Sequence, residues 1–346
     1  MFNVLFITND QAHSRTYLNQ SIRYRCFNLA EALLTHGASS EVIPVSRVSS
    51  NVLKHFEIVV FHRPLCNGPL LSLVKAAKKH SKLLIADYDD LVFHPDFAAA
   101  APAVINADSN IDSHNKLISQ YKRCLALFDH FTVSTQPLAD KLADFTPHAH
   151  IKVIRNQLSK TWIERHATEA QPPQSSPRIT YLSGSKTHNN DFAKIEAELA
   201  SGLEDNPDLE LMIVGHLDYN RQLFPADRLI HHPKVPYEQI PQLIKQSTIN
   251  LAPLASNAFN DCKSAIKCLE SAIFGTAFIG SPLEDLERFE HQQIQCIPTN
   301  VSWLDDLHYC LDTQASASES LAQYMYQQMA TQDQANQFCN FVKSSL

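Results

Sequence analysis

Short apolar runs alternate with amphipathic helical patterns along most of the chain, and this alternation limits the possible folds more than any other feature. In the first half the apolar runs are expected to be strands, at 3–8, 40–45, 56–63 and 82–90. Residues 21–37 and 70–80 have the spacing of amphipathic helices between such strands. A strand, a helix and another strand form the unit of a parallel sheet covered by helices. The first half therefore predicts a doubly wound α/β domain.

A stretch without periodicity, ATEAQPPQSSP at 167–177, interrupts this pattern and indicates a linker. Beyond it a second series of strand patterns begins, at 178–184, 209–215, 229–235, 248–254 and 277–281. We therefore expect two Rossmann-like domains, with a binding cleft between them. The expected boundaries are an N-terminal domain over 1–165, a linker over 166–177, a C-terminal domain over 178–320, and a C-terminal helix over 321–346 that packs back toward the first domain.

Composition excludes several classes of protein. The chain has 346 residues, 44% of them hydrophobic and 19% charged, which is typical of soluble globular proteins. A net charge of −7 leaves no basic footprint, so nucleic acid is not expected as a partner. No apolar run approaches the roughly 20 residues of a membrane span, and MFNVLFITND does not resemble a signal peptide. We expect a cytoplasmic protein, at most peripheral at the inner face of the membrane.

The sequence offers no motif for a metal or a cofactor. Eight cysteines occur without a C-x-x-C pair, which argues against a zinc ribbon or a redox motif. His231 and His232 are adjacent, and adjacent side chains point apart in most backbones. We therefore expect no metal site and no cofactor.

The segment NDCKSAIKCLESAIFGTAFIGS, residues 260–281, carries the most informative charge pattern. Its apolar residues at helical spacing predict a core-facing stripe, formed by Ala265, Ile266, Leu269, Ala272 and Ile273. Lys263, Lys267 and Glu270 are spaced i, i+4 and i+7, so they share a second face. One interpretation is a solvated face with a helical ion pair, and the other is a ligand site.

Features at the two ends of this helix favour the ligand site. Asn260 and Ser264 are polar candidates for capping its start, where unsatisfied N–H groups and the helix dipole attract an anion such as a phosphate. Gly275 is expected to end the helix, directly before the strand at 277–281. A phosphate at the helix start would leave Glu270 placed to accept hydrogen bonds from a ribose hydroxyl.

A second candidate phosphate site follows the strand at 178–184, in SGSKTHNND. Gly184 and Ser185 would let the backbone approach a phosphate. Side-chain donors for that phosphate would come from Lys186, Thr187 and His188. The alternative is an ordinary turn capped by Asn190 or Asp191.

Acidic residues end the strand LLIADYDDLVF of the first half, at the edge of a parallel sheet where ligands bind. There a carboxylate of Asp87, Asp89 or Asp90 could bind hydroxyl groups or take a proton, and Asp89 and Asp90 are the catalytic candidates. Arg25 and Arg63 are expected on the same side of the cleft. The alternative is a pair of turn-forming aspartates, with Asp90 capping a helix, and surface arginines.

Residues 178–281 resemble the donor half of retaining glycosyltransferases with two facing Rossmann-like domains, the GT-B architecture, and specifically the glycosyl transferases group 1 type. Four segments follow in the family's order: YLSGSKTHNNDF, LMIVG, VPYEQIPQLIKQSTINLAPL and FNDCKSAIKCLESAIFGTAFIGS. The first half resembles the family more loosely, through IRYRCFNLAEALLTHG, DYDDLVF, FDHFTVSTQPLADKL and IKVIRN.

The resemblance implies a retaining, hexosyltransferase-like enzyme that acts without a metal. It would move a sugar from a nucleoside diphosphate sugar to a carbohydrate or lipid-linked acceptor, in cell-surface polysaccharide or glycoconjugate synthesis. It also implies that Lys263 and the amides near Ser264 hold the diphosphate and that Glu270 binds the ribose. Many relatives carry two glutamates separated by seven residues, but Cys262 stands eight positions before Glu270. Either Asp261 replaces that first carboxylate as a catalytic residue, after a shift of one position, or the N-x-x-K-S pattern of residues 260–264 is used differently.

Two other functions remain open at this point. Cys262 in place of a glutamate favours a non-catalytic nucleotide-sugar or glycan-binding protein with the same fold. A weaker alternative comes from the D-x-D of Asp87 and Asp89 after an apolar strand, which resembles the nucleophile strand of haloacid-dehalogenase-type phosphatases. In those enzymes one aspartate is phosphorylated and the next serves as the acid and base.

Overall fold

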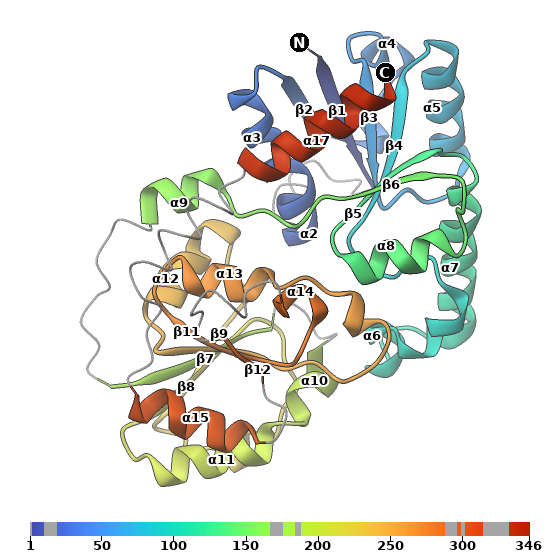
Figure 1. Cartoon of the computed structure of the whole chain (residues 1–346). Coiled ribbons are helices and arrows are strands. Elements are labelled where there is room, and N and C mark those ends of the chain that lie inside the picture. The colour runs from blue at the N-terminus through green and yellow to red at the C-terminus, as the bar shows by residue number, and fades with distance from the viewer. Residues whose placement is uncertain are drawn as a thin grey trace.

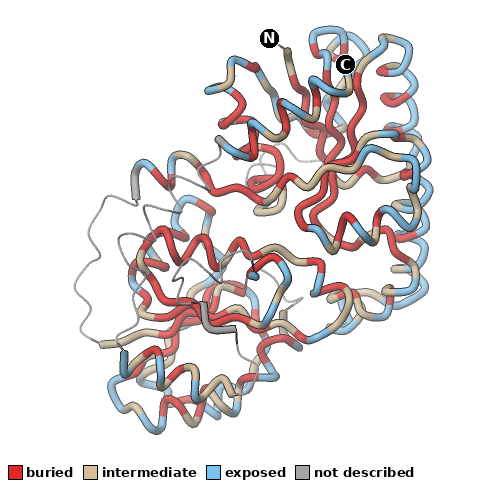
Figure 2. Tube along the Cα trace, in the orientation of Figure 1, coloured by how far each residue is buried: buried red, intermediate tan, exposed pale blue. Residues whose placement is uncertain are grey.

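The computed structural model describes residues 2–9, 19–166, 176–183, 188–287, 296–298, 302–313 and 332–346. Within these residues the strands form two parallel sheets of six strands each, as the alternating pattern predicts (Figure 1). The inner strands of both sheets are buried, the edge strands β2, β6 and β9 are partly exposed, and helices cover the faces of the sheets (Figure 2). The fold is therefore α/β, with two Rossmann-like doubly wound domains.

The sheet of the first domain has the strand order β2-β1-β3-β4-β5-β6. Its strands are β1 (Asn3–Thr8), β2 (Ser39–Pro44), β3 (Ile58–His62), β4 (Leu83–Tyr88), β5 (His130–Val133) and β6 (His150–Val153). All neighbours run parallel, so the carboxyl ends of the strands meet at one edge. That edge faces the second domain and carries the polar side chains described below.

Helices of the first domain connect these strands. They are α2 (Gln20–Ile22), α3 (Asn28–Thr35), α4 (Ser50–Leu53), α5 (Gly68–Lys79), α6 (Pro102–Ile105), α7 (Ile111–Leu125) and α8 (Gln136–Ala143), with 3-10 turns η2 (Val45–Arg47) and η3 (Pro95–Ala100). The single helix expected at 21–37 contains a π-helical segment, η1 (Arg23–Phe27). Such wide turns in helices often lie at functional sites.

The sheet of the second domain has the order β12-β11-β10-β7-β8-β9. Its strands are β7 (Arg178–Leu182), β8 (Glu210–Val214), β9 (Leu229–His232), β10 (Ile249–Ala252), β11 (Ala277–Gly280) and β12 (Cys296–Pro298). Its helices are α10 (Asn189–Ala193), α11 (Glu196–Asp205), α12 (Ile240–Lys245), α13 (Ile266–Ala272), α14 (Glu284–Glu287) and α15 (Trp303–Asp312), with 3-10 turns η5 (Arg221–Leu223), η6 (Tyr237–Gln239) and η7 (Asn260–Cys262). Gly275 adopts a φ of 72° just after α13, and the chain then enters β11.

The last helix of the chain, α17 (Gln332–Ser345), packs on α3 of the first domain (Figure 1). Phe338 is fully buried there, with its ring centroid 6.3 Å from that of Phe6 on β1. The chain thus crosses back from the second domain to complete the core of the first. Among the helices that the structure describes, none combines the length and the apolar character needed to cross a bilayer.

The two domains also touch through side chains near the cleft. Thr135 Oγ1 donates a hydrogen bond of 2.8 Å to the carbonyl oxygen of Cys262, and Arg155 Nε lies 3.1 Å from Asp285 Oδ1. On the other side Trp162 of α9 (Lys160–His166) stacks on Tyr237, with ring centroids 4.0 Å apart. These contacts on both sides fix how the carboxyl edges of the two sheets face each other.

Candidate functional site

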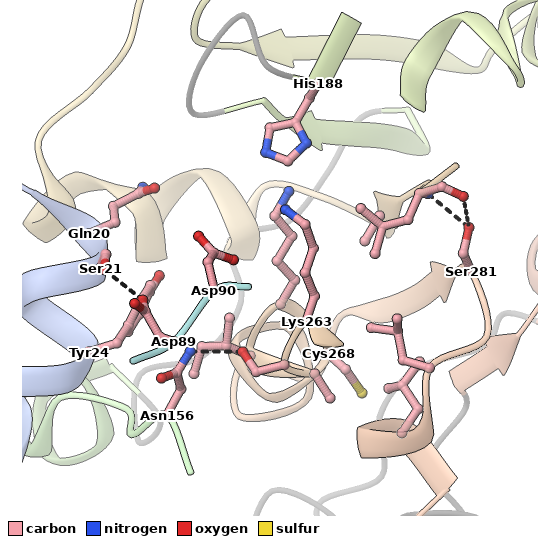
Figure 3. Close-up of a pocket in the computed structure, with 18 of the residues that line it drawn as sticks. Gln20, Ser21, Tyr24, Asp89, Asp90, Asn156, His188, Lys263, Cys268 and Ser281 are labelled. Carbon is pink, nitrogen blue, oxygen red and sulfur yellow. Dashed lines mark hydrogen bonds between the residues drawn. The ribbon is translucent and has the colours of Figure 1, made fainter. Parts of the chain in front are cut away.

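Two adjoining hollows, of about 230 and 520 Å³, lie between the domains, and together they are called the cleft here. Residues of both domains line both hollows: Gln20, Ser21, Tyr24, Arg63, Asp90, His188, Lys263, Ile266 and Lys267. In Figure 3, Lys263 reaches into the space between Asp90 and His188. The cleft therefore brings acidic groups of the first domain opposite cationic groups of the second.

The cations on the second domain's wall are Lys263 and Lys267. Lys267 Nζ donates a hydrogen bond of 2.9 Å to the carbonyl oxygen of Leu182 and lies 5.4 Å from the ring centroid of Tyr181. Burial, followed by the charge of Lys263, lowers the pKa of Lys267 to about 8. Because two like charges are held close together at the cleft, an anion bound between them would relieve their repulsion. The pair is thus suited to a diphosphate.

The start of α13 differs from the expected capping. Its N-cap is Ala265, which makes no side-chain cap, and the amide N of Ala265 donates instead to Asp285 Oδ2 at 2.9 Å. Ser264 lines the cleft, and its Oγ accepts a hydrogen bond of 2.8 Å from Asn156 Nδ2. Asn260 is buried outside the cleft and donates to the carbonyl oxygen of Ala255 at 2.8 Å. The expectation that Asn260 and Ser264 cap the helix was wrong, because η7 ends the first turn before α13 begins.

Glu270 is buried and lines the larger hollow. It accepts a hydrogen bond from the hydroxyl of Tyr24, which stands 246 positions earlier in the chain. Burial raises the pKa of Glu270 to about 7, although the bond from Tyr24 and the charge of Lys267 act in the opposite direction. Glu270 is therefore a desolvated carboxylate at the cleft rather than half of a surface ion pair.

His188 stands opposite Lys263 and is polarised by Asp191. Its Nδ1 lies 3.0 Å from Asp191 Oδ2, and burial together with Lys263 lowers the pKa of His188 to about 4. Burial opposes ionisation of Asp191, but the bonds from His188 and the amide of Ala255 lower its pKa overall. Since the carboxylate only accepts, Nδ1 carries the proton and Nε2 is left as an acceptor. At neutral pH His188 therefore suits a sugar hydroxyl better than the phosphate expected from the sequence.

The rest of the expected glycine-serine loop lies outside the described residues. These positions are Gly184, Ser185, Lys186 and Thr187. Their proposed contact with a phosphate stays a prediction. The flanking Ser183 and His188 line the larger hollow, so the ends of this loop are at the cleft.

The first domain's wall is organised by Arg63, at the end of β3, with a φ of 44°. Arg63 donates to Asp89 and, at 2.6 Å, to Asp90 Oδ2, while Ser21 Oγ donates to Asp89 Oδ2 at 2.6 Å. Burial opposes ionisation of Asp89, but Arg63 and His62 outweigh it and hold its pKa well below the usual range. Such a carboxylate is a weak proton acceptor. Asp89 and Asp90 are thus placed to accept hydrogen bonds from hydroxyls.

Arg25 does not line the cleft, contrary to the sequence prediction. It is 3% exposed, and it forms an ion pair and two hydrogen bonds with Asp87 beneath the sheet edge. His62 Nδ1, at 2.9 Å, and Thr132 Oγ1, at 2.7 Å, complete the surroundings of Asp87. A carboxylate buried on a central strand requires a counter-charge, and Arg25 supplies it.

Asp261, expected to replace a catalytic glutamate, is exposed and lines neither hollow. Its neighbour Cys262 is 1% exposed and packs in the hydrophobic core of the first domain, with Phe259 and Leu138. The turn η7 directs residue 262 into that core and residue 261 to solvent. The structure therefore does not support a catalytic role for Asp261.

The cleft residues that sequence patterns missed include Ser21, Tyr24, Asn156 and Ser281. Tyr24 belongs to a segment that fits an amphipathic helix, where an aromatic residue is expected in the core. Its partner Glu270 and the partner of Asn156, Ser264, lie in the other domain. No local signal identifies contacts across such separations.

Residues 196–339 match a family model described as "Glycosyl transferase-like". A comparison with curated proteins finds no match.

Solved structures of similar fold cover nearly the whole chain. Sucrose-phosphate synthase from Thermosynechococcus elongatus is 11% identical, with a TM-score of 0.60 and coverage of 100% of both chains. HepE from Anabaena, in complex with UDP-glucose, is 12% identical, with a TM-score of 0.63 over 99% of this chain and 100% of that chain. A glycosyltransferase from Rickettsia africae is 12% identical, with a TM-score of 0.61 over 99% and 98%. At such low identity the likeness shows the fold alone.

Proposed function

We propose that the chain moves a sugar from a nucleoside diphosphate sugar to a carbohydrate or lipid-linked acceptor, because residues 196–339 match a glycosyl transferase-like family model and the fold is that of GT-B glycosyltransferases. One observation carries this proposal. Lys263, Lys267 and Glu270 lie on one wall of the cleft, and Asp89 and Asp90 lie on the other. The first wall suits an anionic donor and the second a hydroxylated acceptor. A role in cell-surface polysaccharide or glycoconjugate synthesis is part of the proposal.

The donor's diphosphate would lie against Lys263 and Lys267. When the bond from the sugar to the diphosphate breaks, negative charge develops on the leaving oxygen, and preorganised cations stabilise it. Two lysines supply this charge directly, which supports transfer without a divalent ion. Because HepE forms complexes with UDP and with UDP-glucose, UDP is the first nucleotide to test. Transfer from UDP-glucose should proceed equally with and without a chelator.

We further propose that the anomeric configuration is retained, on the resemblance of residues 178–281 to retaining enzymes. The acceptor hydroxyl would lie near Asp90 and Ser21 on the first wall, across the cleft from Lys263 (Figure 3). Proton NMR of the product formed from UDP-α-glucose reports the anomer. An α-linked product supports retention, and a β-linked product contradicts it.

A second candidate function is non-catalytic binding of a nucleotide sugar. The burial of Cys262 and the exposure of Asp261 favour it, because no carboxylate replaces the missing glutamate at that point. Binding of UDP-glucose without transfer or hydrolysis would identify such a protein. The phosphatase alternative is not supported, since Asp87, its candidate nucleophile, is occupied by Arg25, His62 and Thr132.

Lys263→Ala should weaken binding of UDP roughly tenfold to hundredfold, the equivalent of losing a charge-assisted contact of about 1.5–3 kcal/mol. The melting temperature should stay nearly the same, because Lys263 is partly exposed. Isothermal titration calorimetry measures the affinity. Lys194→Ala, an exposed lysine outside the cleft, is the matched control. Unchanged affinity in Lys263→Ala would show that the diphosphate binds elsewhere.

A thermal-shift screen tests the donor class before any acceptor is known. UDP, GDP, ADP and their sugars are compared at one concentration, and a ligand present at a hundred times its dissociation constant stabilises the fold by about 2.7 kcal/mol. We expect UDP and its sugars to give the largest shift. If no nucleoside diphosphate stabilises the protein, the proposed function is wrong.

A further inference from the structure

One hydrogen bond in the cleft joins the two domains at the expected ribose position. The hydroxyl of Tyr24, on the π-helical segment η1, donates to Glu270 Oε1 on α13. Tyr24 is 8% exposed and lines both hollows, and Glu270 lines the larger one. The contact is thus at the border between protein core and cleft, where a ligand would meet it.

The ring of Tyr24 belongs to a buried cluster that includes aromatic rings from three other segments. It meets Tyr237 of η6 edge to face, with centroids 5.7 Å apart and an interplanar angle of 75°. Tyr237 stacks on Trp162 of α9, and Trp162 lies 6.2 Å from Phe274, just beyond α13. Buried rings packed in this way have little rotational freedom. The hydroxyl is therefore aimed at Glu270 by packing.

The groups facing Glu270 decide whether it is charged. Tyr24 from η1 and Lys267 from its own helix favour the ionised form, burial opposes it, and Tyr237 faces it as a neutral phenol. The other charged or titratable groups of the second domain on the larger hollow are Lys234, His188 and Lys263. The pKa of Glu270, about 7, places the balance near neutral pH. Gaining or losing one hydrogen bond at this carboxyl group therefore changes its charge at neutral pH.

We propose that Tyr24 is a positioning residue for the donor, which orients the Glu270 carboxylate and keeps it ionised so that it accepts hydrogen bonds from the ribose of a nucleoside diphosphate. The inference rests on the proposed function and deepens it. Since Tyr24 belongs to the first domain and Glu270 to the second, the contact exists only while the domains are closed on each other. The acceptor-side domain thus takes part in recognising the donor.

Tyr24→Phe tests this role because it removes only the hydroxyl. A hydrogen bond to a charged group is strong enough that its loss should raise the pKa of Glu270 by roughly one to two units. An acid with a raised pKa is charged only at higher pH. The affinity of Tyr24→Phe for UDP should therefore be about tenfold weaker than the parent's at pH 7.5, and the loss should disappear toward pH 9.5.

Calorimetric titrations with UDP from pH 6 to pH 9.5 measure this dependence. The terminal phosphate of UDP titrates near pH 6, as phosphate monoesters do, but its contribution cancels in the ratio of parent to variant. Tyr237→Phe is the matched control, since it removes a buried hydroxyl of the same aromatic group whose hydrogen bond, at 3.4 Å, comes from Asn28 Nδ2. The affinity of Tyr237→Phe for UDP should depend on pH in the same way as the affinity of the parent.

A second measurement needs no ligand. Carbon-13 NMR of protein labelled at the glutamate carboxyl carbons follows each titration, and the signal missing in Glu270→Gln identifies Glu270. Its midpoint should lie near 7 in the parent and higher in Tyr24→Phe. An equal midpoint in both proteins would overturn the proposal.

The outcomes separate this inference from the proposed function. If the parent fails to bind any nucleoside diphosphate, the proposed function fails, while the NMR titration still decides what Tyr24 does to Glu270. If Tyr24→Phe binds UDP more tightly at every pH, Tyr24 competes with the ribose, and the inference is wrong. If it binds more weakly by one factor at every pH, Tyr24 acts only through packing, and the inference is equally wrong.

Discussion

Replacing Arg25 with alanine should lower the free energy of unfolding by about 3–5 kcal/mol, because it leaves a buried charge without its partner. Arg25 and Asp87 are both almost fully buried, and Arg25 also donates to the carbonyl oxygen of Ile154. Urea denaturation of the parent and of Arg25→Ala measures the difference at pH 7.

The pH dependence of that difference provides an independent check. Burial opposes ionisation of Asp87, but Arg25 and His62 outweigh it and lower its pKa below the usual 3.8. A carboxyl group with a lowered pKa in the folded state contributes stability above the unfolded value, and this contribution is lost as pH falls through the folded value. The difference in the free energy of unfolding between the parent and Arg25→Ala should therefore become smaller below about pH 4.

Arg123→Ala is the control for Arg25→Ala. Arg123 is exposed on α7, and an exposed substitution is expected to change stability by no more than about 0.5 kcal/mol. A loss of less than 1 kcal/mol in Arg25→Ala would mean that the Asp87 network contributes no more than a surface ion pair.

Glu270→Gln should change binding and stability in opposite directions. Loss of the charged acceptor should weaken UDP binding by about 1.5–3 kcal/mol, a tenfold to hundredfold change. The folded protein should at the same time become more stable above pH 7. The parent's Glu270 has a pKa of about 7 in place of 4.5, so its contribution to stability is present below pH 4.5 and is lost as pH rises through 7. At pH 8 the substitution should recover up to about 3 kcal/mol.

Two titrations and a denaturation series check this prediction. The titrations use UDP and inorganic pyrophosphate. Pyrophosphate has no ribose, so the parent and Glu270→Gln should bind it with the same affinity. Glu204→Gln, at an exposed position on α11, should alter neither property. If Glu270→Gln binds UDP as tightly as the parent and is no more stable at pH 8, Glu270 behaves as an ordinary helix-surface residue and the prediction is wrong.

The fold was predictable because its signals are local. Period-two and continuous apolar runs gave β1 at residues 3–8 with its observed bounds, and β4 and β10 within a few residues. The strand β12 was missed because three residues, Cys296–Pro298, are too short for any periodicity. Helix α13 begins at Ile266, after both of its expected caps, because the turn η7 includes Asn260 and the chain is extended at Lys263.

The site was predictable only where chemistry and spacing coincide on one element. Lys263, Lys267 and Glu270 were predicted to share a helical face, and all three line the cleft, although Lys263 precedes α13. Arg25 was misplaced because its direction depends on Asp87, which lies 62 positions away on strand β4. Tyr24 was missed for the same reason, since its role depends on a side chain in the other domain. Such contacts are set by tertiary packing, which leaves no trace in a local pattern.

A crystal structure of the protein with UDP bound tests the central claim most directly, namely that the cleft between the domains holds a nucleoside diphosphate. We expect the diphosphate to lie within hydrogen-bond distance of the Lys263 or Lys267 amine, and a ribose hydroxyl to donate a hydrogen bond to the Glu270 carboxylate. We also expect the Tyr24 hydroxyl to stay on Glu270 in the complex. UDP bound away from the start of α13, with Glu270 still enclosed and its ribose contact absent, would contradict the account.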